Sequence, residues 1–275
     1  MSPPRDETPA QQRNNRAARN ILRALIAGFG LLLPSIACAE LVLSAGVDYL
    51  RWVESTSPQV TETGPLAAFG LGYTQDRDAG WLFAYRGKIW GGSVNYDGAT
   101  LFGGTPVESR TSYLGLTNEL QTRWRKHGAP GGNIDAVLGL GLDAWRRRLS
   151  SVQKEDYLIG YARLGIETGT GETSRWTAGV GFKYPVWIYE NAHFDEIGFD
   201  SNPILHPGKE ISPYVSLGYR LSSTLQLVGY FEGYRFGRSA QVQANEVNLG
   251  VGPTTLVQPA TTVAVYGIRL EYFLP

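Results

Sequence analysis

The feature that most constrains this chain is a run of strict alternation over residues 134–147. Even positions from Ile134 to Ala144 are apolar, whereas several odd positions carry charge or glycine, including Asp135 and Asp143. Successive side chains of a β-strand point to opposite faces, so a period of two predicts a strand. One face of that strand is apolar, and the other is polar or lined by glycine.

The same alternation recurs along the chain and predicts ten strands. They span residues 41–53, 65–74, 81–94, 111–124, 134–147, 157–168, 175–189, 211–221, 224–236 and 261–273. The connections after the even-numbered strands are short. The others are mostly longer and span residues 54–64, 95–110, 148–156, 190–210 and 237–260. Short turns at one end and long loops at the other are typical of an antiparallel outer-membrane β-barrel with periplasmic termini.

The N-terminal residues are typical of an export signal. A polar, arginine-bearing stretch is followed by the mostly apolar residues 21–37, and Ala37-Cys38-Ala39 fits the small-x-small rule for cleavage. We therefore expect residues 1–39 to be a signal peptide and residues 40–275 to be one barrel domain in the outer membrane of a Gram-negative cell. The alternative is that Cys38, the only cysteine, is lipidated.

Composition limits the possible partners. The chain has 275 residues and equal numbers of basic and acidic residues, 25 of each, with no concentrated basic face, so no nucleic-acid partner is expected. Beyond residue 39 no apolar run approaches the roughly 18 residues of a spanning helix, so the chain must cross a membrane by closed strands. The expected partners are outer-membrane lipid and lipopolysaccharide.

The inward phase of the predicted strands carries matched charge. Its acids are Asp48, Glu119, Asp135, Asp143, Glu167, Glu232 and Glu271, and its bases are Arg86, Lys88, Arg147, Arg163, Lys183, Arg220 and Arg269. Unpaired charge in a narrow lumen is costly, so equal numbers predict a paired network and a plugged or very narrow interior. A selective pore would need an excess of one sign.

The seven tryptophans divide into two groups. Trp81, Trp124 and Trp176 lie near the short turns in the outward phase and predict an aromatic girdle at the membrane surface. Trp52, Trp90, Trp145 and Trp187 lie near the long loops in the inward phase. Two interpretations of this second group remain open. A β-bulge or loop packing could make it an outer girdle. Alternatively, it could line a mouth that holds an apolar ligand or lipid, joined by Tyr189, Tyr214 and Tyr234.

Two resemblances extend these expectations. The last strand, residues 265–273, resembles the C-terminal signal that the barrel-assembly machinery reads, although Leu274-Pro275 follow its final aromatic residue. The stretch from residue 181 to residue 211 resembles the corresponding part of the omptin surface proteases, which are ten-stranded barrels. That resemblance implies a water-activating pair centred on His193 and Asp97. Asn191 stands where the omptin motif has an aspartate.

The sequence thus favours a non-enzymatic barrel that serves structure or surface interaction, or forms a narrow passage. The alternatives are an omptin-like hydrolase centred on His193 and Asp97, or a small channel. No metal-binding motif, cysteine ligand set or nucleophile elbow is present in the sequence, so neither a metal nor a cofactor is expected.

Overall fold

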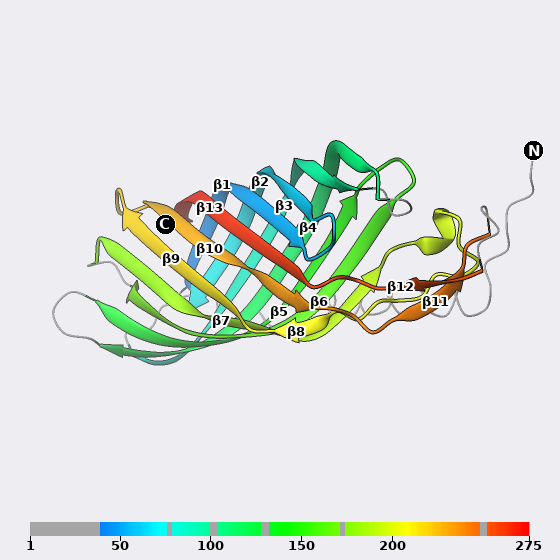
Figure 1. The fold of residues 1–275 in the computed structure, drawn as a ribbon. Coiled ribbons are helices and arrows are strands. Elements are labelled where there is room, and N and C mark those ends of the chain that lie inside the picture. The colour runs from blue at the N-terminus through cyan, green and yellow to red at the C-terminus, as the bar shows by residue number, and fades with distance from the viewer. Residues whose placement is uncertain are drawn as a thin grey trace, which may run out of the picture. The chain divides into compact units, whose positions relative to one another are not determined.

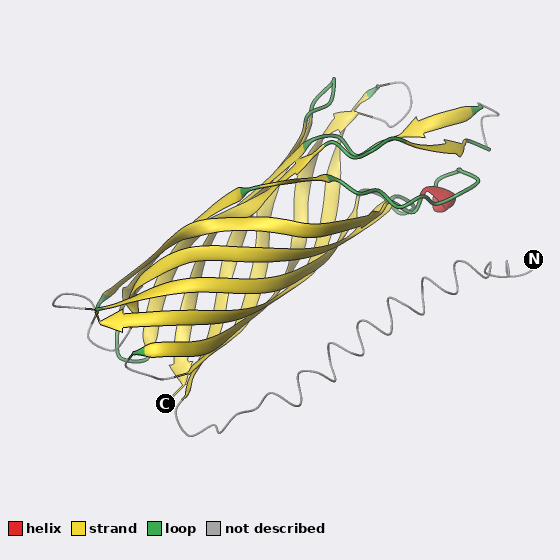
Figure 2. Ribbon diagram, turned by 90° about the horizontal axis from the view of Figure 1, so that it is seen from below, coloured by secondary structure: helices red, strands yellow, loops and turns green. Residues whose placement is uncertain are grey.

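The computed structural model describes residues 39–75, 79–99, 104–127, 132–170, 174–247 and 252–274. Residues 1–38, which include Cys38 and all of the predicted signal peptide except Ala39, lie outside the described residues. Long antiparallel strands wind around one axis to form a barrel (Figures 1 and 2). These strands are β1 (Ala39–Glu54), β2 (Val60–Gln75), β3 (Gly80–Ala99), β4 (Pro106–His127), β5 (Asn133–Arg148), β6 (Lys154–Thr170), β7 (Trp176–Asn191), β9 (Ser212–Arg220), β10 (Leu225–Gly237) and β13 (Thr261–Leu274).

The barrel is closed by its last strand. β13 pairs with β1 from Glu54↔Thr261 to Leu41↔Leu274, and with β10 on its other side. The remaining barrel strands pair with their neighbours in chain order, β7 with β9. Closure leaves neither the first nor the last barrel strand with an unpaired edge. The predicted all-β, antiparallel barrel of about ten strands is therefore confirmed. Among the described residues, no helix is long and apolar enough to cross a membrane.

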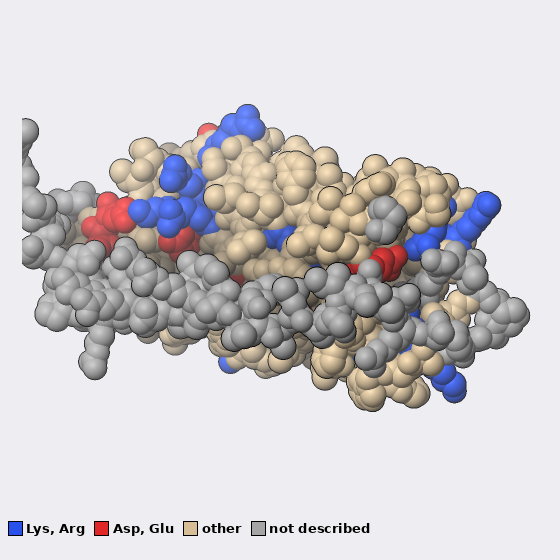
Figure 3. Space-filling model, turned by 180° about the vertical axis from the view of Figure 1, so that it is seen from behind, with Lys and Arg blue, Asp and Glu red and all other residues tan. Residues whose placement is uncertain are grey.

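The outer face of the barrel is apolar across its middle. The exposed large side chains on it come from every barrel strand and include Leu43, Phe69, Phe83, Leu116, Leu140, Leu164, Phe182, Leu217, Leu227 and Ile268. Figure 3 shows that the charged residues in one view gather mostly towards the two ends. We call this middle zone the apolar belt. Trp81, Trp124 and Trp176 face outward near the short turns, as predicted for a girdle.

The two ends of the barrel differ. Both termini of the described chain and the short connections lie at one end, which we call the turn end. The opposite, loop end carries the longer connections. β3 and β4 continue there to the pair Ala99↔Pro106, well past the predicted limits of the strands at residues 94 and 111. Those limits were set where outward apolar side chains stop, but a strand that leaves the membrane presents polar residues to water.

The two longest loops are also partly ordered, which the sequence did not predict. β8 (Gly208–Glu210) lies beside β10, while β11 (Val242–Asn245) and β12 (Pro253–Leu256) form a separate hairpin. This hairpin extends beyond the loop end of the barrel (Figure 2). Its side chains join a small apolar core that consists of Ala192, Phe194, Phe199, Leu205, Ala244 and Leu256. We call the segments that share this core the loop module.

A β-bulge interrupts the alternation of β7. Gly160 of β6 pairs with Trp187 and Tyr161 pairs with Pro185, so Val186 is the extra residue. Inward residues of β7 are odd up to Pro185 and even from Ile188 onward. A bulge puts two residues opposite one and so reverses the phase of every later side chain.

Candidate functional site: the barrel interior

The interior is layered, and the inward residues of β5 pass through the layers in order. Asp135 lies at the turn end, Asp143 in the middle, Trp145 above it and Arg147 at the loop end. Between them, Gly141 leaves room for the ring of Tyr161, which a β-carbon at this position would meet at 2.1 Å. The inward residues of 134–147 therefore contribute to every layer of the barrel interior.

At the turn end, arginines and carboxylates form a shared network. Arg123 Nη1 lies 2.9 Å from Glu167 and 3.6 Å from Asp135. Arg125 makes two hydrogen bonds of 2.9 Å to Asp135, and Arg86 lies 3.0 Å from Glu167. Bidentate contacts of this kind hold both partners in one geometry.

In the middle layer, two lysines bridge strands across the lumen. Lys88 lies 3.2 Å from Asp48 and 3.1 Å from Glu232. Lys183 lies 3.4 Å from Asp143, whose carboxylate also accepts a hydrogen bond from Tyr234. The fourteen residues of the predicted charge network all face inward. Further ion pairs of this network include Arg163 to Glu119 at 3.6 Å, Arg269 to Glu271 at 2.7 Å and Arg220 to Glu40 at 3.9 Å.

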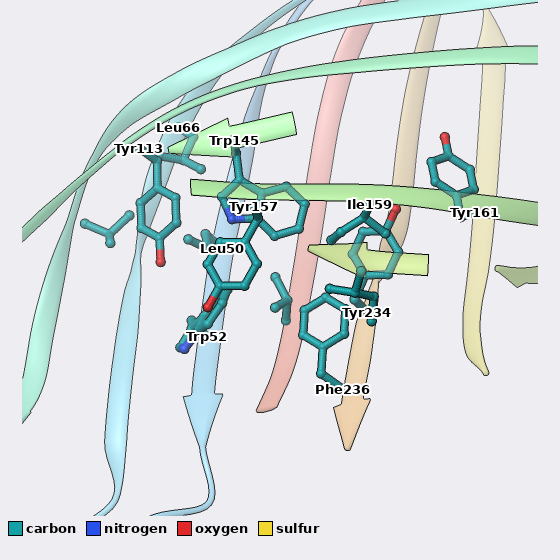
Figure 4. Close-up of a cluster of buried hydrophobic side chains, with 13 residues drawn as sticks. Leu50, Trp52, Leu66, Tyr113, Trp145, Tyr157, Ile159, Tyr161, Tyr234 and Phe236 are labelled. Carbon is teal, nitrogen blue, oxygen red and sulfur yellow. The ribbon is translucent and has the colours of Figure 1, made fainter. Parts of the chain in front are cut away.

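Above this layer, apolar side chains pack across the inside of the barrel (Figure 4). We call them the lumen cluster; its members are Leu50, Trp52, Leu66, Val94, Tyr113, Trp145, Tyr157, Ile159, Tyr161, Ile188, Tyr234, Phe236 and Val263. Trp145 lies at its centre, with its ring centroid 5.2 Å from Tyr157, 6.0 Å from Tyr234 and 6.1 Å from Trp90. These ring pairs join β3, β5, β6 and β10.

The structure divides the loop-end tryptophans into inward and outward side chains. Trp52 and Trp145 are buried in the lumen cluster, and Trp90 packs against it. Trp187 is not a mouth residue: the bulge at Val186 turns it outward, where its side chain is 41% exposed. Of the candidate tyrosines, Tyr234 belongs to the lumen cluster. Tyr214 lies beneath the Arg163 guanidinium at 3.5 Å, and Tyr189 contacts the ring of His206.

Beyond the lumen cluster, at the loop end, four buried glutamates surround one arginine. Arg147 lies 2.7 Å from Glu62, 2.7 Å from Glu155 and 3.0 Å from Glu54. Glu190 is fully buried nearby, and neither of its carboxylate oxygens has a hydrogen-bond partner within the described residues. We call Glu54, Glu62, Glu155 and Glu190 the carboxylate cluster. Along the barrel axis, this cluster lies at the same height as Arg146 and Asp156, a charged pair on the outer face. It therefore lies beyond the apolar belt. Burial raises the pKa of Glu190, and the Glu155 charge raises it further.

Sequence reasoning missed these four glutamates and the turn-end pair Arg123 and Arg125. The glutamates fall in stretches that the sequence analysis assigned to loops. The alternation of inward and outward side chains applies only to strands, so it could not place them inside. For Arg123 the signal was present, because it shares the odd, inward phase of Glu119 in β4. The even charge balance expected of the lumen therefore holds only in part, since acids exceed bases at the loop end.

Two cavities lie within this layered interior. One, of about 1010 Å³, is lined by turn-end residues such as Glu40 and Arg125. The other, of about 50 Å³, lies between the lumen cluster and the middle charges. Both are lined by Lys88, Thr117 and Glu232, so the Lys88–Glu232 ion pair lies between them.

His193, the candidate base, belongs to a network on the outside of the loop end. Its Nε2 atom lies 2.9 Å from Asp156 and its Nδ1 atom 3.2 Å from Glu196. Arg146 makes two hydrogen bonds to Asp156, and Lys154 lies 2.7 Å from Glu196. We call these five residues the rim network. A carboxylate thus lies beside each ring nitrogen, which ties His193 to the rim network.

The structure does not place His193 in contact with Asp97. The Asp97 side chain is exposed on the outward face of β3, and β4, β5 and β6 separate β3 from β7. Asn191 accepts hydrogen bonds from the His193 backbone at 3.0 Å and from Asn202 at 2.9 Å, so it shapes the loop. Among the described residues, no group of three or more His, Cys, Asp or Glu could hold a metal ion.

We expect acid to weaken the attachment of the loop that begins at Ala192 to the barrel, because carboxylates of the rim network hold it there. Burial alone would raise the pKa of Asp156, but hydrogen bonds from His193 and Arg146 outweigh it and hold the pKa well below its ordinary value. A hydrogen bond from Lys154 lowers the pKa of Glu196. A lowered carboxylate pKa stabilises the folded state above the ordinary value of about 4, and this contribution is lost as pH falls through the folded-state value.

Hydrogen exchange would measure this effect. Corrected for intrinsic rates, exchange in residues 192–204 should be flat from neutral pH to about pH 4 and should rise below it. The variant His193→Ala should raise it about tenfold at neutral pH, because the loop loses its link to Asp156. Exchange in β2 is the internal control. An unchanged loop in His193→Ala would show that the rim network does not hold it.

No family model matches this chain, and neither does any curated protein. Three solved structures of similar shape are all outer-membrane barrels. The outer membrane protease OmpT from Escherichia coli is 13% identical with a TM-score of 0.48, covering 88% of this chain and 99% of its own. The translocator domain of autotransporter NalP from Neisseria meningitidis is 12% identical with a TM-score of 0.41, covering 95% and 97%. The outer membrane protein OprG from Pseudomonas aeruginosa is 13% identical with a TM-score of 0.39, covering 86% and 96%.

All three TM-scores are below 0.5. The assignment of this chain to the transmembrane β-barrels therefore rests on its own strand pairing and apolar belt.

Proposed function

We propose that this chain is a non-enzymatic outer-membrane barrel whose interior is closed along its axis and whose loop end serves surface contact. The observation that carries this proposal is the lumen cluster, in which Trp145 stacks on Tyr157 of the neighbouring β6 and also contacts the ring of Tyr234, which comes across the lumen from β10. Aromatic rings packed at centroid distances of about 5 to 6 Å support an interior without a continuous path for water or ions. The predicted signal peptide and the apolar belt support an outer-membrane location, with the turn end in the periplasm.

Two further features support a role in surface contact. The loop module has its own apolar core, and Asp200 accepts hydrogen bonds from Asn245 at 2.6 and 2.9 Å, which ties the two long loops together. Exposed bases also lie on the outer face near the loop end: Arg51, Arg110, Arg146, Arg148 and Arg235. Such bases suit the anionic headgroups of lipopolysaccharide, because guanidinium groups bind phosphate bidentately. The barrel-assembly machinery is the partner proposed for the last strand.

Single-channel recording tests this function. The mature protein, reconstituted in planar lipid bilayers, should insert without stepwise conductance. Insertion is verified independently by recovery of folded protein from matched liposomes. Regular conductance steps from the unaltered protein would overturn the closed interior and favour the small-channel alternative.

A further inference from the structure

Within the described residues, the ladder of hydrogen bonds around the barrel has its longest interruption beside β7, and shorter gaps lie between β2 and β3 and between β9 and β10. β7 pairs with β9 from Trp176↔Tyr219 only as far as Lys183↔Ser212, although β7 continues to Asn191. On its other side β7 stays paired with β6 up to Asp156↔Asn191. An isolated bridge between Glu190 and Leu205 closes the gap at the loop end. We call the gap between residues 184–189 and residues 205–211 the seam.

Side chains replace the missing ladder bonds. The Val186 carbonyl accepts a hydrogen bond from Lys209 Nζ at 2.5 Å, and the Ile188 carbonyl accepts one from His206 Nδ1 at 2.9 Å. Pro185 and Pro213, one on each flanking strand, have no backbone N–H to donate. Backbone groups that face lipid must be satisfied, and flexible side chains satisfy them here without joining the strands.

The segment across the seam is held from the other side. β8 pairs with β10 from Gly237↔Gly208 to Arg235↔Glu210, and the Arg235 backbone donates to Ser212 at 2.8 Å. β8 and β9 thus run in line beside β10 (Figure 1). The seam can therefore widen between β7 and this segment without breaking any other strand pair.

The seam joins two apolar regions. On its outer side Tyr184, Val186 and Ile211 are exposed in the apolar belt, between 44% and 58% of each side chain. On its inner side Ile188 belongs to the lumen cluster, and Phe236 lies on β10 opposite Lys209. The 50 Å³ cavity beside Trp145 and Tyr234 gives these rings free volume into which they can shift.

We propose that the seam is a lateral portal through which a single acyl chain with an anionic headgroup passes from the membrane to the lumen cluster. The tail lies against Ile188 and Phe236, and the headgroup lies at Lys209 and His206, which are both exposed. Hydrocarbon on one side and buried aromatic rings on the other favour an apolar chain, and the two basic side chains favour a carboxylate. The portal deepens the proposed function by adding a ligand, and it rests on the membrane location.

A disulfide across the seam tests the portal. Tyr184 and Ile211 are the next positions beyond the last β7–β9 pair, so Tyr184→Cys with Ile211→Cys, in a Cys38→Ser background, locks the seam when oxidised. Leu116→Cys with Ala144→Cys is the matched control, because these outward residues face each other in an intact ladder. Each protein is reconstituted in liposomes containing a fatty acid with a photoactivatable diazirine in its tail.

Mass spectrometry then locates the label. In the open protein, inward residues such as Trp145, Ile188 and Tyr234 should be modified. Oxidation of the seam pair should reduce this labelling at least about fivefold, with recovery on reduction, while the control pair should not change it. Labelling confined to outward residues, or inward labelling that the seam lock leaves unchanged, would overturn the portal. Because conductance is measured separately, that result would leave the proposed function intact.

A single substitution keeps the test decisive where the cysteine pair does not fold. Lys209→Met removes the donor to the Val186 carbonyl and should speed inward labelling by the uncharged methyl ester of the probe, which needs no base for its headgroup, several-fold, while Lys126→Met, exposed at the turn end, should not. Equal labelling rates in the two variants would contradict the portal.

Discussion

The variant Arg147→Met should lose about 3–5 kcal/mol of unfolding free energy. Within the part of the chain that the structure describes, Arg147 is the one base that contacts Glu54, Glu62 and Glu155, and it is 1% exposed. Its removal leaves three buried carboxylates without their counter-charge, and an uncompensated buried charge costs more than the ion pair itself contributes. The loss would be measured by urea unfolding in liposomes, followed by gel mobility of the folded form.

The neighbouring residue supplies a matched control for this prediction. Arg146 carries the same side chain but faces outward, where it pairs with Asp156 and is 48% exposed. Arg146→Met should cost less than about 1 kcal/mol, because water screens an exposed pair. Acidification should restore part of the stability of Arg147→Met, since protonated carboxyl groups no longer repel each other. Equal losses in the two variants would contradict a structural role for the carboxylate cluster.

The double variant Trp145→Ala/Tyr157→Ala should turn a silent barrel into a conducting one. The two rings stack at 5.2 Å in the middle of the lumen cluster, and Tyr157 donates a hydrogen bond to Glu155 in the layer above. Loss of both rings joins the 50 Å³ cavity, which Trp145 lines, to the loop end. Planar-bilayer recordings should then show discrete steps that the unaltered protein lacks. Trp145→Ala alone should cost about 3–5 kcal/mol of unfolding free energy.

Two outward tryptophans provide the control for conductance. Trp124→Ala/Trp176→Ala removes the same kind of side chain from the turn-end girdle and should remain silent. A folded but silent Trp145→Ala/Tyr157→Ala variant would mean that the charged layers, and not the aromatic rings, close the barrel.

The contacts of His193 in the rim network argue against the hydrolase alternative. A base needs a free nitrogen and a nearby carboxylate that orients the ring. His193 has carboxylates at both nitrogens, and the Asp156 carboxylate is itself held by Arg146. This arrangement suits an attachment point for the loop. These contacts favour a structural role for the residue that the omptin resemblance pointed to.

The sequence alone determined the barrel and the facing of most of its side chains. Alternation is a local property of a strand, so Asp135, Asp143 and Arg147 could be placed inside from residues 134–147 alone. The alternation of short and long connections indicated that neighbouring strands are antiparallel and that the barrel has a turn end and a loop end. These signals need no knowledge of which strands meet.

Only the tertiary structure decided what those side chains touch. One extra residue at Val186 turned Trp187 outward, and strands that continue beyond the membrane brought Glu62 and Glu190 from predicted loops into the interior. The end of the β7–β9 ladder at Lys183 likewise depends on pairing between distant segments. Bulges, strand ends and contacts across a lumen are fixed by non-local register, which a period of two along one strand does not encode.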